Sequence, residues 1–176
     1  MDTNVEVVPT TSAQDATREK RRVWKNIIVI TFSFFFIFGS MFSLYRLQST
    51  LNQVEGMGVI TLSIVYATVV ISSMFVPKLM TRFIGHRWTI VVSWLGYIVY
   101  IAANGYAVWS TMIMASVLLG LCHAPLWTAQ SSYFTIIAHH YQRLTGQSAE
   151  HVLPTFFGLF FLLYKACKLQ HINAVY

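Results

Sequence analysis

Two rows of polar and aromatic side chains, each at helical spacing, are the candidate functional residues of this chain. Residues at i, i+4, i+7 and i+11 share one face of a helix. The first row has this spacing and consists of His123, Trp127, Gln130 and Phe134. The second row, also at helical spacing, consists of Ser93, Tyr97, Tyr100 and Asn104. Only His123 among them carries a side chain of the type that changes charge near neutral pH, so the expected chemistry is mainly hydrogen bonding.

These rows allow two interpretations. A polar side chain inside a membrane is costly unless it faces protein or water. His123 and Gln130 therefore predict either a cavity that contacts a solute or partner, or hydrogen bonds that hold neighbouring helices together. The row containing Tyr97 faces the same cavity or packs against the second predicted helix.

The sequence does not indicate an enzyme or a metal centre. His139 and His140 are adjacent, so on a helix they point about 100° apart, and no carboxylate or cysteine accompanies them at ligand spacing. We interpret them as a solvated pair at a membrane interface. Cys122 and Cys167 form no CxxC pair and are expected to fill space in helices. A nucleophile elbow, a P-loop and paired catalytic carboxylates are absent from the sequence, so we expect no cofactor and no metal.

The composition indicates that helices in a bilayer position these rows. Hydrophobic residues make up 56% of the chain and charged residues 10%, which predicts an all-α integral membrane protein. From Trp88 to Gln142 there is no Lys, Arg, Asp or Glu. Because about 20 apolar residues cross a membrane, this stretch predicts two helices, divided near residues 104–110. The two rows then lie on neighbouring antiparallel helices.

The whole chain is expected to form four full spans and a short fifth. We predict a disordered cytoplasmic tail over residues 1–22, a membrane domain over residues 23–167 and a divergent tail over residues 168–176. The predicted helices cover about residues 26–48, 57–77, 88–105, 111–138 and 154–167. Residues 78–87 are expected to be a short basic loop, and Pro125 is expected to kink the fourth helix.

The basic residues predict the orientation and the main partner, the lipid bilayer. The formal net charge is +6, but most of the N-terminal charge lies directly before the first apolar run. Such a cluster places the N-terminus in the cytoplasm and contacts anionic headgroups, so nucleic acid is not an expected partner. The cluster consists of Arg18, Lys20, Arg21, Arg22 and Lys25.

Four blocks of the sequence, in this order, resemble the "uncoordinated ninety-three" family. They are residues 45–52, 56–58, 82–89 and 120–133, and the segment from Ala124 to Gln130 is the most specific. The resemblance covers about residues 22–166. It implies a branch of the major facilitator superfamily, with two six-helix halves around a central cavity, of which this chain would supply part of the N-terminal half. Members of the family are regarded as regulatory subunits of potassium channels or as trafficking partners of membrane receptors.

The resemblance also implies which residues form the site, because the first and fourth helices of such folds line the cavity. The cavity or partner-contact candidates are Gln48, Asn52, Tyr97, Tyr100, Asn104, His123, Trp127 and Gln130. In the cytoplasmic loop motif, Gly85 and Arg87 match the superfamily, but Lys78 and Arg82 occupy the places of its usual Gly and Asp. The acid that normally latches this loop to a helix is therefore missing.

Three functions remain open from the sequence. The leading hypothesis is a multispanning protein that regulates a membrane partner such as a potassium channel. It is favoured because no carboxylate lies inside a predicted span, which leaves an ordinary Asp/Glu proton relay unavailable. The alternatives are a facilitator-type transporter of a small solute, and a truncated chain without function of its own.

Overall fold

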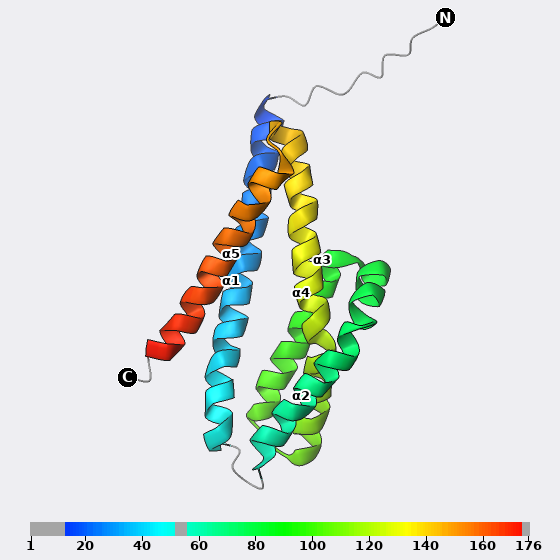
Figure 1. The fold of residues 1–176 in the computed structure, drawn as a ribbon, viewed down its shortest axis with the longest axis vertical. Coiled ribbons are helices and arrows are strands. Elements are labelled where there is room, and N and C mark those ends of the chain that lie inside the picture. The colour runs from blue at the N-terminus through cyan, green and yellow to red at the C-terminus, as the bar shows by residue number, and fades with distance from the viewer. Residues whose placement is uncertain (1–12, 52–55, 174–176) are drawn as a thin grey trace, which may run out of the picture.

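The described part of the chain is a bundle of five α-helices (Figure 1). The computed structural model describes residues 13–51 and 56–173, and within these ranges there is no strand. The helices are α1 (Ala13–Leu51), α2 (Met57–Ser73), α3 (Val76–Asn104), α4 (Trp109–Thr145) and α5 (Ala149–Asn173). Figure 1 shows α1 beside α5 and α2 beside α3 and α4, with α4 also contacting α1 and α5. The all-α prediction is confirmed.

Two or three membrane spans, rather than four, meet the requirements of length and composition. The segment Gln14–Tyr45 and helix α4 are each long and apolar enough to cross a bilayer. Helices α2 and α3 meet the requirement only as a pair, and they are bent by 76° at the break between them. Neither helix meets the requirement by itself, because α2 has 17 residues and the first part of α3 is charged. The four full spans expected from the sequence stay a prediction.

Helix α1 begins earlier than predicted. Residues 13–22, which were expected to belong to a disordered tail, are helical, whereas residues 1–12 lie outside the described ranges. The segment contains Ala, Gln, Arg, Glu and Lys, which are favourable helix residues. Glu19 and Arg22 also form an ion pair of 2.9 Å one turn apart. Intrinsic propensity therefore extends the helix beyond the apolar segment.

The predicted loop over residues 78–87 is also helical. Helix α3 starts at Val76, with Pro77 in its first turn, where a proline has no hydrogen bond to lose. Its single departure from helical geometry is Gly85, with φ 75° and ψ 162°. This conformation is accessible to glycine and strained for other residues, so Gly85 separates a short basic helical segment from the apolar remainder of α3.

The connection between α4 and α5 is shorter than predicted. Helix α4 continues through Pro125 and past the predicted end at residue 138 to Thr145, and Gly146 caps it at φ 72°. Helix α5 starts at Ala149, where the Glu150 N–H donates to Ser148 Oγ at 3.3 Å. It has 25 residues and includes residues 168–173 of the predicted tail. The capping residues, rather than the limits of the apolar runs, decide these ends.

An aromatic cluster joins α1, α3, α4 and α5. Phe34 of α1 is 1% exposed, and its ring centroid lies 6.0 Å from Trp94, 6.0 Å from Trp127 and 5.2 Å from Phe160. All three contacts are edge-to-face, the arrangement that aromatic quadrupoles favour. Phe34 therefore ties α1 to the helices that carry the two polar rows.

Helices α2 and α4 approach closely at Gly120. A Cβ at this position would lie 2.5 Å from Thr68 Cβ and 2.8 Å from the Val65 carbonyl oxygen. Ser72 Oγ donates a hydrogen bond of 3.0 Å to the Gly120 carbonyl oxygen. Small residues allow such backbone contact between membrane helices. Gly120 therefore has a packing role.

Candidate functional site

The two polar rows meet at a hydrogen bond between α3 and α4. Tyr97 Oη lies 2.6 Å from His123 Nδ1, and the two rings are stacked with centroids 6.1 Å apart. Tyr97 is 1% exposed and His123 is half-buried. The tertiary structure therefore places the His123 imidazole against a neighbouring helix.

Three buried polar groups lie on the same two helices. Gln130 is 1% exposed, and its Oε1 accepts a hydrogen bond of 3.3 Å from Ser131 Oγ. Gln130 Nε2, Ser93 Oγ and Trp94 Nε1 have no hydrogen-bond partner in the described part of the chain. A buried donor without a partner costs about 1 to 3 kcal/mol. Such donors are therefore candidates for contact with a group from outside the described bundle.

The other predicted residues have different surroundings. Tyr100 is fully buried, and its carbonyl oxygen accepts a hydrogen bond of 2.8 Å from Asn104 Nδ2. Trp127 is half-buried in the aromatic cluster, with its ring centroid 5.4 Å from Phe38 and 5.6 Å from Tyr164. Gln48 lies within α1, but its side chain is outside what the structure describes. Asn52 falls between the described ranges.

The chemistry available to this polar region is the binding of neutral groups. The chain has no acid between Glu55 and Glu150, so the facing segments of α3 and α4 contribute no carboxylate. Tyr97, His123 and Gln130 supply hydroxyl, imidazole and amide groups, which donate and accept hydrogen bonds. Their arrangement fits either helix association or contact with an uncharged polar ligand.

We predict that the bond between Tyr97 and His123 stabilises the pairing of α3 and α4. Tyr97→Phe should lower the free energy of unfolding by about 0.6 to 1.7 kcal/mol, which are the average and the largest values measured for hydrogen bonds between membrane helices. The measurement is thermal unfolding in detergent for Tyr97→Phe, His123→Ala and the double variant. Additive losses in this cycle would show that the two side chains do not interact.

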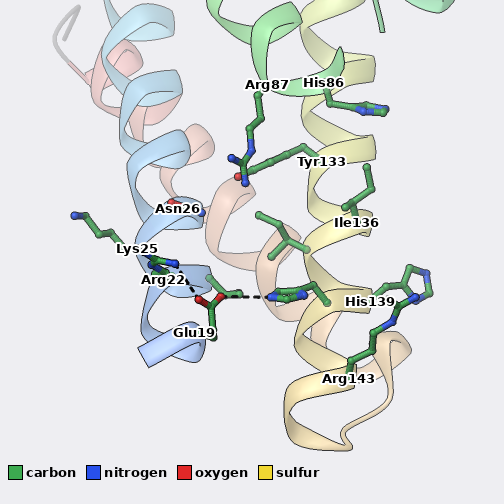
Figure 2. Close-up of a pocket in the computed structure, with 13 residues that line it drawn as sticks. Glu19, Arg22, Lys25, Asn26, His86, Arg87, Tyr133, Ile136, His139 and Arg143 are labelled. Atoms are coloured by element: carbon green, nitrogen blue, oxygen red, sulfur yellow. Dashed lines mark hydrogen bonds and ion pairs between the residues drawn. The ribbon is translucent and has the colours of Figure 1, made fainter. Parts of the chain in front are cut away.

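The residues of the predicted loop motif, Arg82, Gly85 and Arg87, lie on α3 and have different surroundings. Arg82 is exposed on the first part of α3, one turn before Gly85. Arg87 reaches toward α4, where its Cζ lies 5.6 Å from the centroid of the Tyr133 ring (Figure 2). Arg87 also lines a cavity of about 940 Å³ between α1, α3 and α4, which we call the basic cavity. Its lining includes Glu19, Arg22, Asn26, Arg87, Tyr133 and His140.

The sequence did not reveal this cavity. The charges before the first span were interpreted as signals of membrane orientation, and His139 and His140 as a solvated pair. Both histidines are exposed, and both line the basic cavity. One signal was available: Tyr133, Ile137 and His140 are spaced by four and three residues, so they share a face of α4. Only the packing of α1 against this face brings the charges together.

Comparison with known proteins gives one family. Residues 48–151 match the model of the family described as "Ion channel regulatory protein UNC-93". "Protein unc-93 homolog A" of Xenopus laevis is 42% identical over 142 residues, which is 81% of this chain. The protein of the same name from Homo sapiens is 38% identical over 145 residues, or 82% of this chain. A Caenorhabditis elegans protein named "Putative potassium channel regulatory protein unc-93" is 30% identical over 158 residues, or 90% of this chain.

The matches cover only part of these relatives. The aligned region is 31% of the Xenopus protein, 32% of the human protein and 22% of the nematode protein. The chain therefore spans about a third or less of their length. No solved structure matches the chain.

Proposed function

Because the chain belongs to the UNC-93 family of ion channel regulatory proteins, we propose that it acts by contacting another membrane protein, and that this partner is a potassium channel. The main support for this proposal is the family match, which covers all of α2, α3 and α4. The channel class is taken from the printed name of the nematode relative.

The distribution of acids supports a regulator over an ion-coupled pump. Among the described residues, Asp15 and Glu19 lie near the start of α1, and Glu150 lies in the first turn of α5. Proton relays through membranes usually depend on Asp, Glu or His within the spans. Here His123 is the histidine in the middle of the packed helices, and it is bonded to Tyr97.

The test is co-expression with a potassium channel. We expect the full-length protein that contains this segment to change the channel's whole-cell current severalfold, through gating or through the number of channels at the surface. Whole-cell current and surface biotinylation measure the two effects separately. An unrelated multispanning protein at equal expression is the control. Unchanged current and unchanged surface level, with both proteins in the same membrane, would refute the proposal.

One observation favours a second function, the passage of a small uncharged solute. Gln130 Nε2, Ser93 Oγ and Trp94 Nε1 are buried donors without a partner in the described part of the chain, and a polar solute would satisfy them. Uptake of a labelled solute into proteoliposomes that Gln130→Met abolishes, with the channel effect intact, would favour transport. Met has nearly the same volume as Gln, so this change removes the polar group and leaves packing in place.

A further inference from the structure

The basic cavity has more positive charge than its own residues neutralise. Four cationic side chains line it, and one carboxylate, that of Glu19, opposes them, which leaves a formal charge of +3 with neutral histidines. Glu19 is already engaged, at 2.9 Å from Arg22 Nη1 and 3.7 Å from His140 Nε2. The four cations are Arg22, Lys25, Arg87 and Arg143. An anion with more than one negative charge would complete this charge balance.

The cavity lies at the charged end of the apolar runs of α1 and α4, which is where lipid headgroups are expected. The apolar run of α1 begins at Ile27, directly after the cavity residues Arg22 and Asn26. On α4 the cavity begins at Tyr133 and extends past the apolar run to Arg143. Trp24 and Tyr141, which are typical of membrane interfaces, occur at the same end. Basic pockets between membrane helices at this depth suit phosphorylated headgroups.

The walls provide donors that match a phosphate. Figure 2 shows Arg87 extending from α3 toward Tyr133, with Glu19 and Asn26 projecting from α1. The Arg87 guanidinium lies over the Tyr133 ring, a contact that leaves its N–H groups available along the edge. Arg22 uses Nη1 for Glu19, and its guanidinium has further N–H donors. Ile136 and Ile137 add apolar lining beside these groups.

We propose that the basic cavity binds a phosphate-bearing anion, with Arg22 on α1 and Arg87 on α3 as its principal ligands. The headgroup of a phosphorylated inositol lipid and a soluble inositol phosphate share this chemistry. Binding of either would bridge α1 to α3 and α4, because residues of all three helices line the cavity. The ligand would therefore also set how α1 packs against the other helices.

The test measures binding of short-chain phosphatidylinositol 4,5-bisphosphate and of inositol 1,4,5-trisphosphate to the purified 176-residue chain in detergent. Arg22→Gln with Arg87→Gln should weaken binding at least tenfold. The matched control is Arg21→Gln with Arg82→Gln, which removes the same charge from the same two helices outside the cavity lining. This control should change binding less than twofold. Glu19→Gln should strengthen binding severalfold, because it removes the opposing carboxylate and frees Arg22.

Some outcomes of this test identify the source of the phosphate, and others refute the proposal. Binding of the lipid alone assigns the site to a membrane headgroup, and binding of the soluble compound assigns it to a free phosphate. Equal losses in the two double variants would show general attraction to positive charge and would overturn the proposal. The absence of binding by both probes would overturn it as well. Tighter binding by Glu19→Gln would exclude misfolding as the cause of the change, because a misfolded protein would not bind the probes more tightly.

Discussion

Gly120→Ala is expected to lower the stability of the bundle by about 3 kcal/mol, since a single added methyl group overlaps α2. The new Cβ would lie 2.5 Å from Thr68 Cβ and 2.8 Å from the Val65 carbonyl oxygen, and a backbone atom cannot turn aside as a side-chain end can. Moving the helices apart would also strain the bond from Ser72 Oγ to the Gly120 carbonyl oxygen. A loss of this size should lower the melting temperature by about 6 to 12 °C, measured by fluorescence-detected size exclusion after heating.

The same substitution at Gly158 is the matched control. Gly158 lies within α5, is exposed, and has no atom within 4 Å of an added Cβ. Alanine is favoured over glycine in a helix by about 1 kcal/mol, so Gly158→Ala should leave the melting temperature unchanged or raise it slightly. Shifts of the same sign and size at the two positions would show that close packing of α2 on α4 does not contribute to stability.

Phe34→Ala is expected to destabilise the bundle by roughly 2 kcal/mol through the cavity that it leaves. In a water-soluble protein, replacing a buried Phe by Ala also loses the free energy gained by moving the ring out of water. Lipid chains are as apolar as the protein interior, so this contribution is small in a membrane protein. What remains is the loss of the edge-to-face contacts with Trp94, Trp127 and Phe160. The measurement is again the melting temperature in detergent, together with tryptophan fluorescence, which reports the surroundings of Trp94 and Trp127.

Phe36 provides the comparison for this prediction. It lies half a turn away on the same helix and is 67% exposed, so lipid or detergent can replace its ring. Phe36→Ala should therefore change the unfolding free energy by less than about 0.5 kcal/mol. If Phe34→Ala and Phe36→Ala both changed the unfolding free energy by this small amount, the aromatic cluster would not be what holds α1 against α4.

The bond between Tyr97 and His123 and the basic cavity lie at different positions along α4. Tyr133, beside the basic cavity, is ten residues beyond His123 on α4, which is about 15 Å along the helix axis. A ligand in the basic cavity would not touch Tyr97 or His123. It would act on them only through the packing of α1, which contacts both regions through Arg22 and Phe34.

The sequence alone determined the class of the protein and the position of its central residues. Its low charge and long uncharged run identified apolar helices, because hydrocarbon excludes charged side chains. Helical spacing also predicted that Tyr97 and His123 belong to rows on neighbouring helices, and the two side chains do meet between α3 and α4. These features depend on local spacing and on composition, which are visible in a single chain.

The exact helix ends and the contacts between distant side chains became visible in the folded chain alone. The helices were predicted from the limits of the apolar runs. Intrinsic propensity and capping residues extend them past these limits, to residues 13, 76 and 145. The bond between Tyr97 and His123 and the meeting of Arg22 with Arg87 around one cavity join residues that are 26 and 65 positions apart. Such contacts depend on the angle and register at which whole helices pack, and helical spacing carries no information about either.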